Sequence, residues 1–153
     1  EDPPPEDPED PPPPADPCPD GIANAFGTRC YFVSTETATW AAAQGACVQW
    51  GGALVIMDAP FEDGFVATLT QQSVWIGGSD TQLDNAYVWV DGRPMPGPGQ
   101  GGNWGPQQPN AFAGSFDCIE KRQEQFEPWY DQPCDAALSY VCEKAPVPPA
   151  TAQ

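Results

Sequence analysis

Apolar residues recur at helical spacing near the end of the first third of the chain. One stripe of a helix would hold Trp40, Ala43, Cys47 and Trp50. Thr37 can cap such a helix, and the pair Gly51-Gly52 supplies the residues that commonly end one. The pattern predicts a helix with Cys47 on its buried face.

A second helix is predicted a few residues later. Phe61, Phe65 and Leu69 are spaced by four and form one apolar face. Asp58 is a suitable cap, and Pro60 falls in the first turn, where proline is tolerated.

Short apolar runs elsewhere are typical of strands. They are Tyr31–Val33, Leu54–Ile56, Val74–Gly77 and Tyr87–Val90. The last run is followed by Asp91-Gly92, a dipeptide that favours a hairpin turn.

Three tryptophans allow two interpretations. Trp75, Trp89 and Trp104 have side chains suited either to stacking on a ligand or to filling a core. For Trp75 and Trp89, which lie in predicted strands, we expect core packing.

Regular periodicity disappears between Arg93 and Ser115, which is rich in proline and glycine. An irregular stretch of this length in a compact domain is usually functional or disordered. Strands bound it and a cysteine follows it, so we expect a folded loop that carries a binding surface.

The two ends differ from the middle in composition. Residues 1–17 repeat acidic residues and proline, which predicts an extended, solvated linker about 50 Å long. We expect one domain at 18–144 and a flexible tail at 145–153. No apolar run approaches the roughly 20 residues of a membrane helix.

Charge excludes some partners. The 153 residues carry a formal net charge of −17. Nucleic acids and anionic lipid surfaces require a basic face, so neither is an expected partner. An acidic surface suits cations, including calcium.

The chain contains six cysteines and no histidine, which limits the roles that the cysteines can have. The chain has no Cys-x-x-Cys, which disfavours zinc and leaves three disulfides in an oxidising compartment as the better interpretation. Six cysteines allow many pairings, and the sequence alone does not choose among them. We therefore expect a secreted or surface-displayed protein.

Several short motifs occur in an order that resembles the C-type lectin-like domain. They are Trp75-Ile76-Gly77-Gly78, Val88-Trp89-Val90-Asp91-Gly92, Asn103-Trp104-Gly105, Gln108-Pro109-Asn110, Trp129-Tyr130-Asp131 and Tyr140-Val141-Cys142-Glu143. The resemblance covers roughly Cys18 to Glu143. It implies an α+β fold of two helices on small antiparallel sheets with a long irregular loop. It also implies the disulfides Cys47–Cys142, Cys118–Cys134 and Cys18–Cys30.

The resemblance implies a calcium site built from the triplet Gln108-Pro109-Asn110, with a cis peptide bond before Pro109, and from Asp131. In sugar-binding relatives two further ligands stand where this chain has Tyr130 and Phe116, which do not ligate in that way. Only Asp131 keeps its charge, so an ion here is expected to bind weakly unless Asp117, Glu120 or Glu127 contributes. The alternative is that Gln108 and Asn110 only satisfy loop backbone groups.

An auxiliary calcium site of some relatives is partly matched. Asp80, Asp84 and Asp117 occupy three of its acidic positions, while Ala111 and Phe116 depart from it. Calcium is therefore the one cofactor that the resemblance implies.

Two functions follow as expectations. The first is a carbohydrate-recognition module in which Gln108, Asn110 and Asp131 hold sugar hydroxyls through calcium. Phe112 then favours galactose-like sugars by stacking, although it is equally suited to anchoring the loop. The alternative is a calcium-independent module for protein–protein or structural interaction that presents exposed aromatics, namely Phe112, Phe116, Phe126 and Tyr130. We do not expect an enzyme, because no histidine or nucleophile motif is present and Ser115 and Ser139 lack a base.

Overall fold

The computed structural model describes residues 16–24, 28–58, 60–83, 85–110, 117–123 and 128–147. Its elements, in chain order, are β1 (Ile22–Ala23), β2 (Cys30–Val33), α1 (Trp40–Trp50), β3 (Ala53–Leu54), α2 (Pro60–Leu69), β4 (Val74–Ser79), β5 (Val88–Trp89), β6 (Asp117–Lys121), β7 (Trp129–Pro133) and β8 (Ser139–Lys144). The predicted α+β class is confirmed.

The first predicted helix is present as α1, and it begins later than its predicted cap. Thr39, not Thr37, caps it by accepting the N–H of Ala42 at 3.2 Å. Ala38 is bridged to Leu138, so the chain remains extended up to that point and the helix starts beyond it. At the other end Gly51 has φ 107° and donates to Cys47 and Val48, as expected of a glycine cap.

The second predicted helix is α2. Phe65 and Leu69 pack against the main core from its apolar face. The side chain of Phe61 lies outside the described residues. The predicted cap residue, Asp58, directs its carboxylate at two guanidinium groups, those of Arg93 at 3.0 Å and Arg29 at 3.4 Å.

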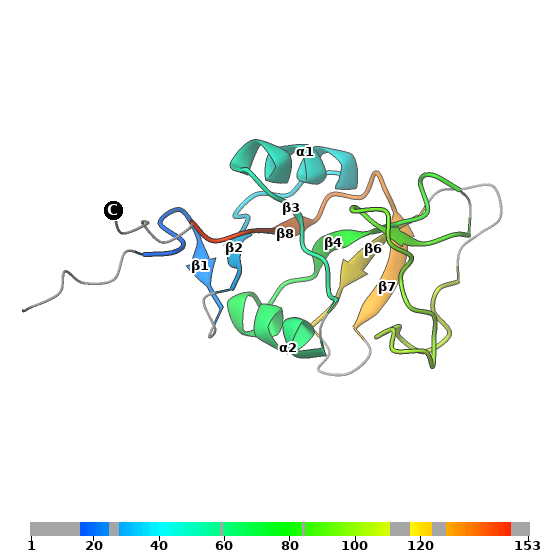
Figure 1. Ribbon diagram of the computed structural model, residues 1–153. Helices are drawn as coiled ribbons and strands as arrows, with labels where there is room; N and C mark the ends of the chain where they lie inside the picture. The colour runs from blue at the N-terminus through cyan, green and yellow to red at the C-terminus, as the bar shows by residue number, and fades with distance from the viewer. Residues whose placement is uncertain are drawn as a thin grey trace, which may run out of the picture.

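The strands form one mixed sheet in the order β1-β2-β8-β4-β6-β7, with β3 beside β8 and β5 beside β4. Every pair is antiparallel except β4 and β8, which run parallel through Val74–Ser139 and Trp75–Tyr140. Figure 1 shows α1 and α2 on opposite sides of these strands and the long loop at the far end from β1. The sheet therefore supports the loop at one end of the molecule.

The predicted strand Leu54–Ile56 is shorter in the structure, because β3 ends at Leu54. The backbone of Val55 still links two neighbours: its N–H donates to Val141 at 3.0 Å and its carbonyl accepts from Gly77 at 2.7 Å. The predicted hairpin after β5 is present, with Gly92 at φ 90° and Val88 bridged to Pro94.

Tryptophan side chains fill the core as expected. Trp75 is fully buried, and Trp89 is 3 % exposed. Trp104, whose use the sequence left open, is also buried at 5 % exposed and contacts Trp129 edge to face, with ring centroids 5.6 Å apart. All three are therefore packing residues.

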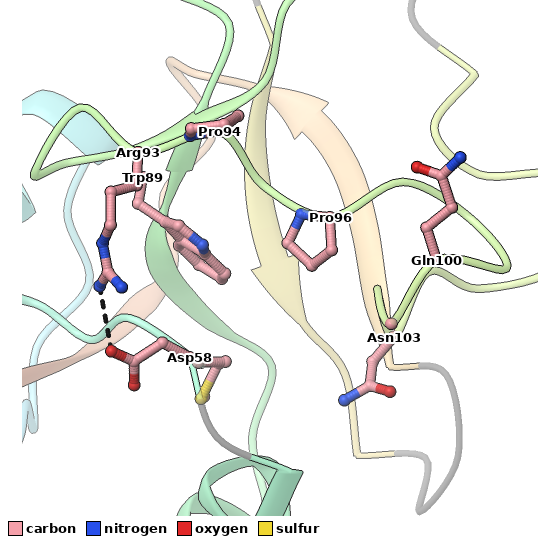
Figure 2. A pocket seen from close by; sticks show the side chains of 9 residues that line it. Asp58, Trp89, Arg93, Pro94, Pro96, Gln100 and Asn103 are labelled. Carbon is pink, nitrogen blue, oxygen red and sulfur yellow. Dashed lines mark hydrogen bonds and ion pairs between the residues drawn. The ribbon is translucent and has the colours of Figure 1, made fainter.

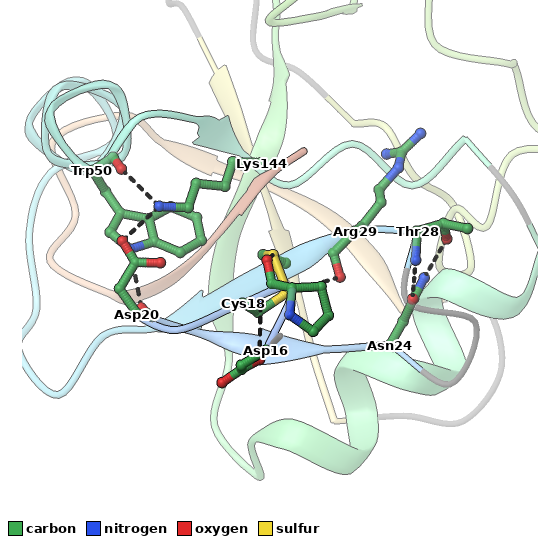
Figure 3. The surroundings of a disulfide bond; sticks show 10 residues. Asp16, Cys18, Asp20, Asn24, Thr28, Arg29, Trp50 and Lys144 are labelled. Carbon is green, nitrogen blue, oxygen red and sulfur yellow. Dashed lines mark hydrogen bonds and ion pairs between the residues drawn. A yellow bond between two sulfur atoms is a disulfide. The ribbon is translucent and has the colours of Figure 1, made fainter. Parts of the chain in front are cut away.

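The three expected disulfides are present. Cys47–Cys142 joins α1 to β8, and Cys118–Cys134 joins β6 to the segment after β7. Cys18–Cys30 closes the hairpin that contains β1 and β2 (Figure 3). Near it the Lys144 Nζ pairs with Asp20 at 2.6 Å and lies over the Trp50 ring, which ties this hairpin to α1 and β8.

The described ends of the chain lie together. The N–H of Val147 donates to the carbonyl of Pro17 at 2.9 Å, beside β1 and β2. Of the helices in the described residues, neither α1 nor α2 has the length and apolar character that crossing a membrane requires.

Candidate functional site

The long loop is fixed to β7 by backbone hydrogen bonds. Trp129 donates to the carbonyl of Asn103 at 2.9 Å, and Gly105 donates to the carbonyl of Trp129 at 2.8 Å. The Trp104 indole donates to the carbonyl of Pro96 at 2.8 Å, which holds the preceding turn. The described part of the loop therefore ends, at Asn110, in a firmly placed segment.

The triplet lies against Asp131. The peptide bond between Gln108 and Pro109 is cis, as expected. The Gln108 Oε1 accepts the N–H of Asp131 at 3.1 Å, and the Asp131 Oδ2 accepts the N–H of Asn110 at 2.8 Å. We use the name triplet site for Gln108 and Asn110, the two polar residues of the triplet, together with Asp131.

Burial raises the pKa of Asp131 above its usual range, and the nearby carboxylate of Asp80 acts in the same direction. The N–H of Asn110 and the hydroxyl of Tyr87, 3.5 Å from Oδ2, oppose this effect. Burial and the charge of Asp131 in turn raise the pKa of the Tyr87 phenol. The one carboxylate of the triplet site thus accepts hydrogen bonds inside the protein.

Calcium binding requires six to eight oxygen ligands, several of them anionic. The triplet site offers one carboxylate, and both the Gln108 carbonyl and that carboxylate already accept backbone N–H groups. In the described part of the chain, no group of three or more acidic, cysteine or histidine side chains is placed to hold a metal. Among the described residues, the triplet site therefore offers fewer anionic ligands than a calcium ion usually takes.

The acids expected near it have structural bonds. Glu120 accepts from Arg122 at 2.8 Å and from Gln132 at 2.7 Å. Asp80 is fully buried, and its two oxygens accept the N–H groups of Asp117 at 2.6 Å and Asn85 at 2.9 Å. Asp117 is buried at the start of β6. Asp84 lies outside the described residues, as does Glu127.

Of the four aromatic residues proposed as a contact surface, Tyr130 alone lies among the described residues. Phe112, Phe116 and Phe126 fall outside the described residues. Tyr130 is half-buried, and the Arg122 guanidinium lies 3.7 Å from its ring centroid. Of the two serines considered as nucleophiles, Ser139 donates to Gln72 at 3.0 Å, and Ser115 is not among the described residues.

One cluster was not anticipated from the sequence. The Arg29 guanidinium pairs with Glu143 at 2.8 Å and lies 3.8 Å from Glu62. Burial raises the pKa of Glu62 to about 9, and burial also raises the pKa of Glu143. A hydrogen bond with Glu62, together with Arg93 and Arg29, lowers the pKa of Asp58 to about 2. The only signal in the sequence is a glutamate inside the predicted α2.

A second unanticipated contact holds the loop. Asp63 of α2 accepts the Trp129 indole N–H at 2.9 Å and the Asn103 side-chain amide at 2.6 Å. Burial raises the pKa of Asp63, against the effect of these two donors. The helix α2 thereby positions both the long loop and β7.

Comparison with known proteins places this geometry in context. A type-2 ice-structuring protein from Hemitripterus americanus is 33 % identical over 125 residues, which cover 82 % of this chain and 73 % of that protein. A solved calcium-independent type II antifreeze protein has a TM-score of 0.72 and 30 % identity, covering 85 % of this chain and 95 % of its own.

The carbohydrate-recognition domain of the mouse scavenger receptor C-type lectin is similar to the same degree, with a TM-score of 0.72 and 28 % identity. The similarity covers 84 % of this chain and 96 % of that domain. The sequence model of the lectin C-type domain family matches residues 36–144. With this match across the helices, the sheet and the long loop, the chain belongs to the C-type lectin domain family.

Proposed function

We propose that this chain is a binding module whose ligand surface is the long loop and the facing edge of β7, and that it works without a resident calcium ion. One observation carries the proposal. The oxygens expected to ligate the ion already accept backbone hydrogen bonds: Gln108 Oε1 accepts the N–H of Asp131, and Asp131 Oδ2 accepts the N–H of Asn110.

Recruiting those oxygens to an ion would cost these hydrogen bonds. The half-buried N–H of Asp131 would then lose its partner, and an unsatisfied N–H away from water costs roughly 1–3 kcal/mol, whereas water can replace the partner of the exposed Asn110 N–H. One carboxylate offers little electrostatic return for that cost. The internal bonds therefore replace the ion as the device that holds the loop.

The similarity to an antifreeze protein described as calcium-independent supports this proposal, because that protein has this fold and is described as independent of the ion. The similarity to a carbohydrate-recognition domain makes a glycan one candidate ligand class, and the ice-structuring relative adds ice. A protein partner is the remaining class. Binding a glycan, ice or a protein partner requires no catalysis.

The three disulfides support secretion or display on the cell surface, since such bridges persist in oxidising compartments. In this proposal residues 1–17 are an acidic linker, residues 18–144 the binding domain and residues 145–153 its tail.

A second candidate is calcium-assisted glycan binding at the triplet site. The observation that favours it is that Gln108 and Asn110 each form a hydrogen bond with Asp131. Its finer form, a preference for galactose-like sugars, depends on Phe112.

Thermal unfolding with EDTA or with excess calcium separates the two candidates. A ligand present at about 100 times its Kd stabilises the folded state by roughly 2.7 kcal/mol, which raises Tm by several degrees. We expect equal Tm values in both buffers, together with any glycan-array or ice-growth signal persisting in EDTA. A calcium-dependent rise in Tm and glycan signals that vanish in EDTA would reject the proposal in favour of the second candidate.

A further inference from the structure

A cavity of about 420 Å³ lies beside the long loop and shares no residue with the triplet site. Its volume falls within the range of small-molecule pockets. Three segments line it: Met57 and Asp58 before α2, Trp89 of β5, and the loop from Arg93 to Asn103 (Figure 2). We call it the Pro96 pocket, after the proline at the middle of its wall.

The walls of the Pro96 pocket are fixed by bonds outside it. The Asn103 amide is held by Asp63 at 2.6 Å, and the Pro96 carbonyl accepts from the Trp104 indole at 2.8 Å. The turn between them closes through the bond from Gln100 N–H to the Gly97 carbonyl at 3.0 Å. A ligand would therefore meet preformed walls, and binding would require little ordering of the loop.

The lining combines apolar surface with paired polar groups. Pro96 and the small accessible part of Trp89 supply apolar surface between the Arg93–Asp58 pair on one side and the amides of Gln100 and Asn103 on the other (Figure 2). The guanidinium supplies N–H donors, the carboxylate supplies acceptors, and each amide supplies both. This set matches hydroxyl groups, which donate and accept at once.

The charges select against ions. Arg93 pairs with Asp58 at 3.0 Å and with Asp91 at 2.6 Å, and Asp58 also pairs with Arg29 at 3.4 Å. Both charged groups of this wall, the Arg93 guanidinium and the Asp58 carboxylate, are therefore already paired. An anionic ligand would meet the Arg93 guanidinium, which already pairs with two carboxylates. A cationic ligand would meet the Asp58 carboxylate, which already pairs with two guanidinium groups.

From these observations we infer that the Pro96 pocket binds a neutral polyhydroxylated ligand of monosaccharide size, through Arg93, Asp58, Gln100 and Asn103 and without calcium. This inference rests on the proposed function and adds to it a site and a ligand class. The loop segment from Arg93 to Asn103 then contributes to binding, in addition to the segment that holds Gln108 and Asn110.

Saturation-transfer NMR with a panel of neutral hexoses and N-acetylhexosamines, in EDTA, tests the inference. We expect binding that weakens by about tenfold in Arg93→Gln and in Gln100→Ala, because each variant removes hydrogen bonds from the pocket wall. Gln100 is exposed and its side chain forms no hydrogen bond with the other described residues, so Gln100→Ala preserves the fold if Arg93→Gln does not. Gln107→Ala, in the same loop and outside the pocket, is the matched control.

The other outcomes overturn the inference in distinguishable ways. Binding in EDTA that is lost in Asp131→Asn and kept in Gln100→Ala would move the sugar to the triplet site and leave calcium independence intact. Binding only with calcium would overturn both this inference and the proposed function. A panel that binds neither in EDTA nor with calcium would reject the Pro96 pocket alone.

Discussion

Gln108 shows how a residue type expected to bind an ion can serve the backbone instead. Its side-chain carbonyl accepts the N–H of Asp131, a residue 23 positions away on β7. An amide oxygen is an equally good partner for a metal or for an N–H group, so the residue type does not decide between them. The geometry of the loop does.

Replacing Gln108 with alanine should loosen the loop, because the Asp131 N–H loses its partner. We expect a loss of roughly 1 kcal/mol in unfolding free energy and faster amide exchange at Asp131. Gln107 is exposed in the same loop, and Gln107→Ala should leave both quantities near the wild-type values. Equal exchange at Asp131 in the two variants would show that the bond does not hold the loop.

Glu62 illustrates the opposite case, an ionisable residue that the fold keeps neutral. It is 1 % exposed, and burial raises its pKa to about 9. Its surroundings contain Arg29, Asp58, Glu143 and the Tyr31 phenol. Because the folded pKa exceeds the unfolded value, the protonated group contributes stability at low pH, and that stability is lost as pH rises toward 9.

Glu62→Gln should therefore flatten the pH profile of stability. Between about pH 5 and pH 9 the wild type should lose up to roughly 1.4 kcal/mol per pH unit from this group, and the variant should not. Urea unfolding across this range measures the difference, with Glu36→Gln at an exposed glutamate as the control. A variant that is less stable than the wild type at pH 8 would mean that Glu62 is charged and paired with Arg29.

At the scale of elements, the local sequence predicted where a helix ends and where the chain turns, but it did not predict how the strands pair. Gly51 ends α1 as its position after an apolar stripe indicated, and Asp91-Gly92 turns the chain as expected. The parallel contact between β4 and β8 has no local signal, because it depends on strands far apart in the sequence. The start of α1 was misplaced for the same reason, since Ala38 is held by Leu138.

The disulfide between α1 and β8 should carry more stability than the one in the amino-terminal hairpin. The Cys47–Cys142 bridge has a sequence separation of 95, and the Cys18–Cys30 bridge has one of 12. In the chain-entropy model these separations correspond to roughly 4.7 and 2.8 kcal/mol. Denaturant unfolding of the variants Cys47→Ala/Cys142→Ala and Cys18→Ala/Cys30→Ala compares them. Equal losses would show that packing at the bridges, rather than loop closure, sets their contribution.

For the whole molecule, the family is readable from the sequence and the ligand chemistry is not. Motifs such as Trp75-Ile76-Gly77-Gly78 are core strands, and packing constrains them in any member of the fold. The Asp63–Asn103 contact and the Arg93–Asp58 pair shape the loop of this chain, and both join segments that the sequence alone does not bring together. The fold is thus predictable from short sequence motifs, whereas the site depends on contacts between segments that are distant in the sequence.

The central claim is that internal hydrogen bonds hold the triplet site in place of a calcium ion. It is tested most directly by following the backbone amide resonances of Asp131 and Asn110 during a calcium titration to about 10 mM, above the millimolar Kd of weak extracellular modules. The account predicts that neither resonance moves and that the Asp131 amide stays protected from exchange. Saturable shifts of both amides, with loss of that protection, would contradict it.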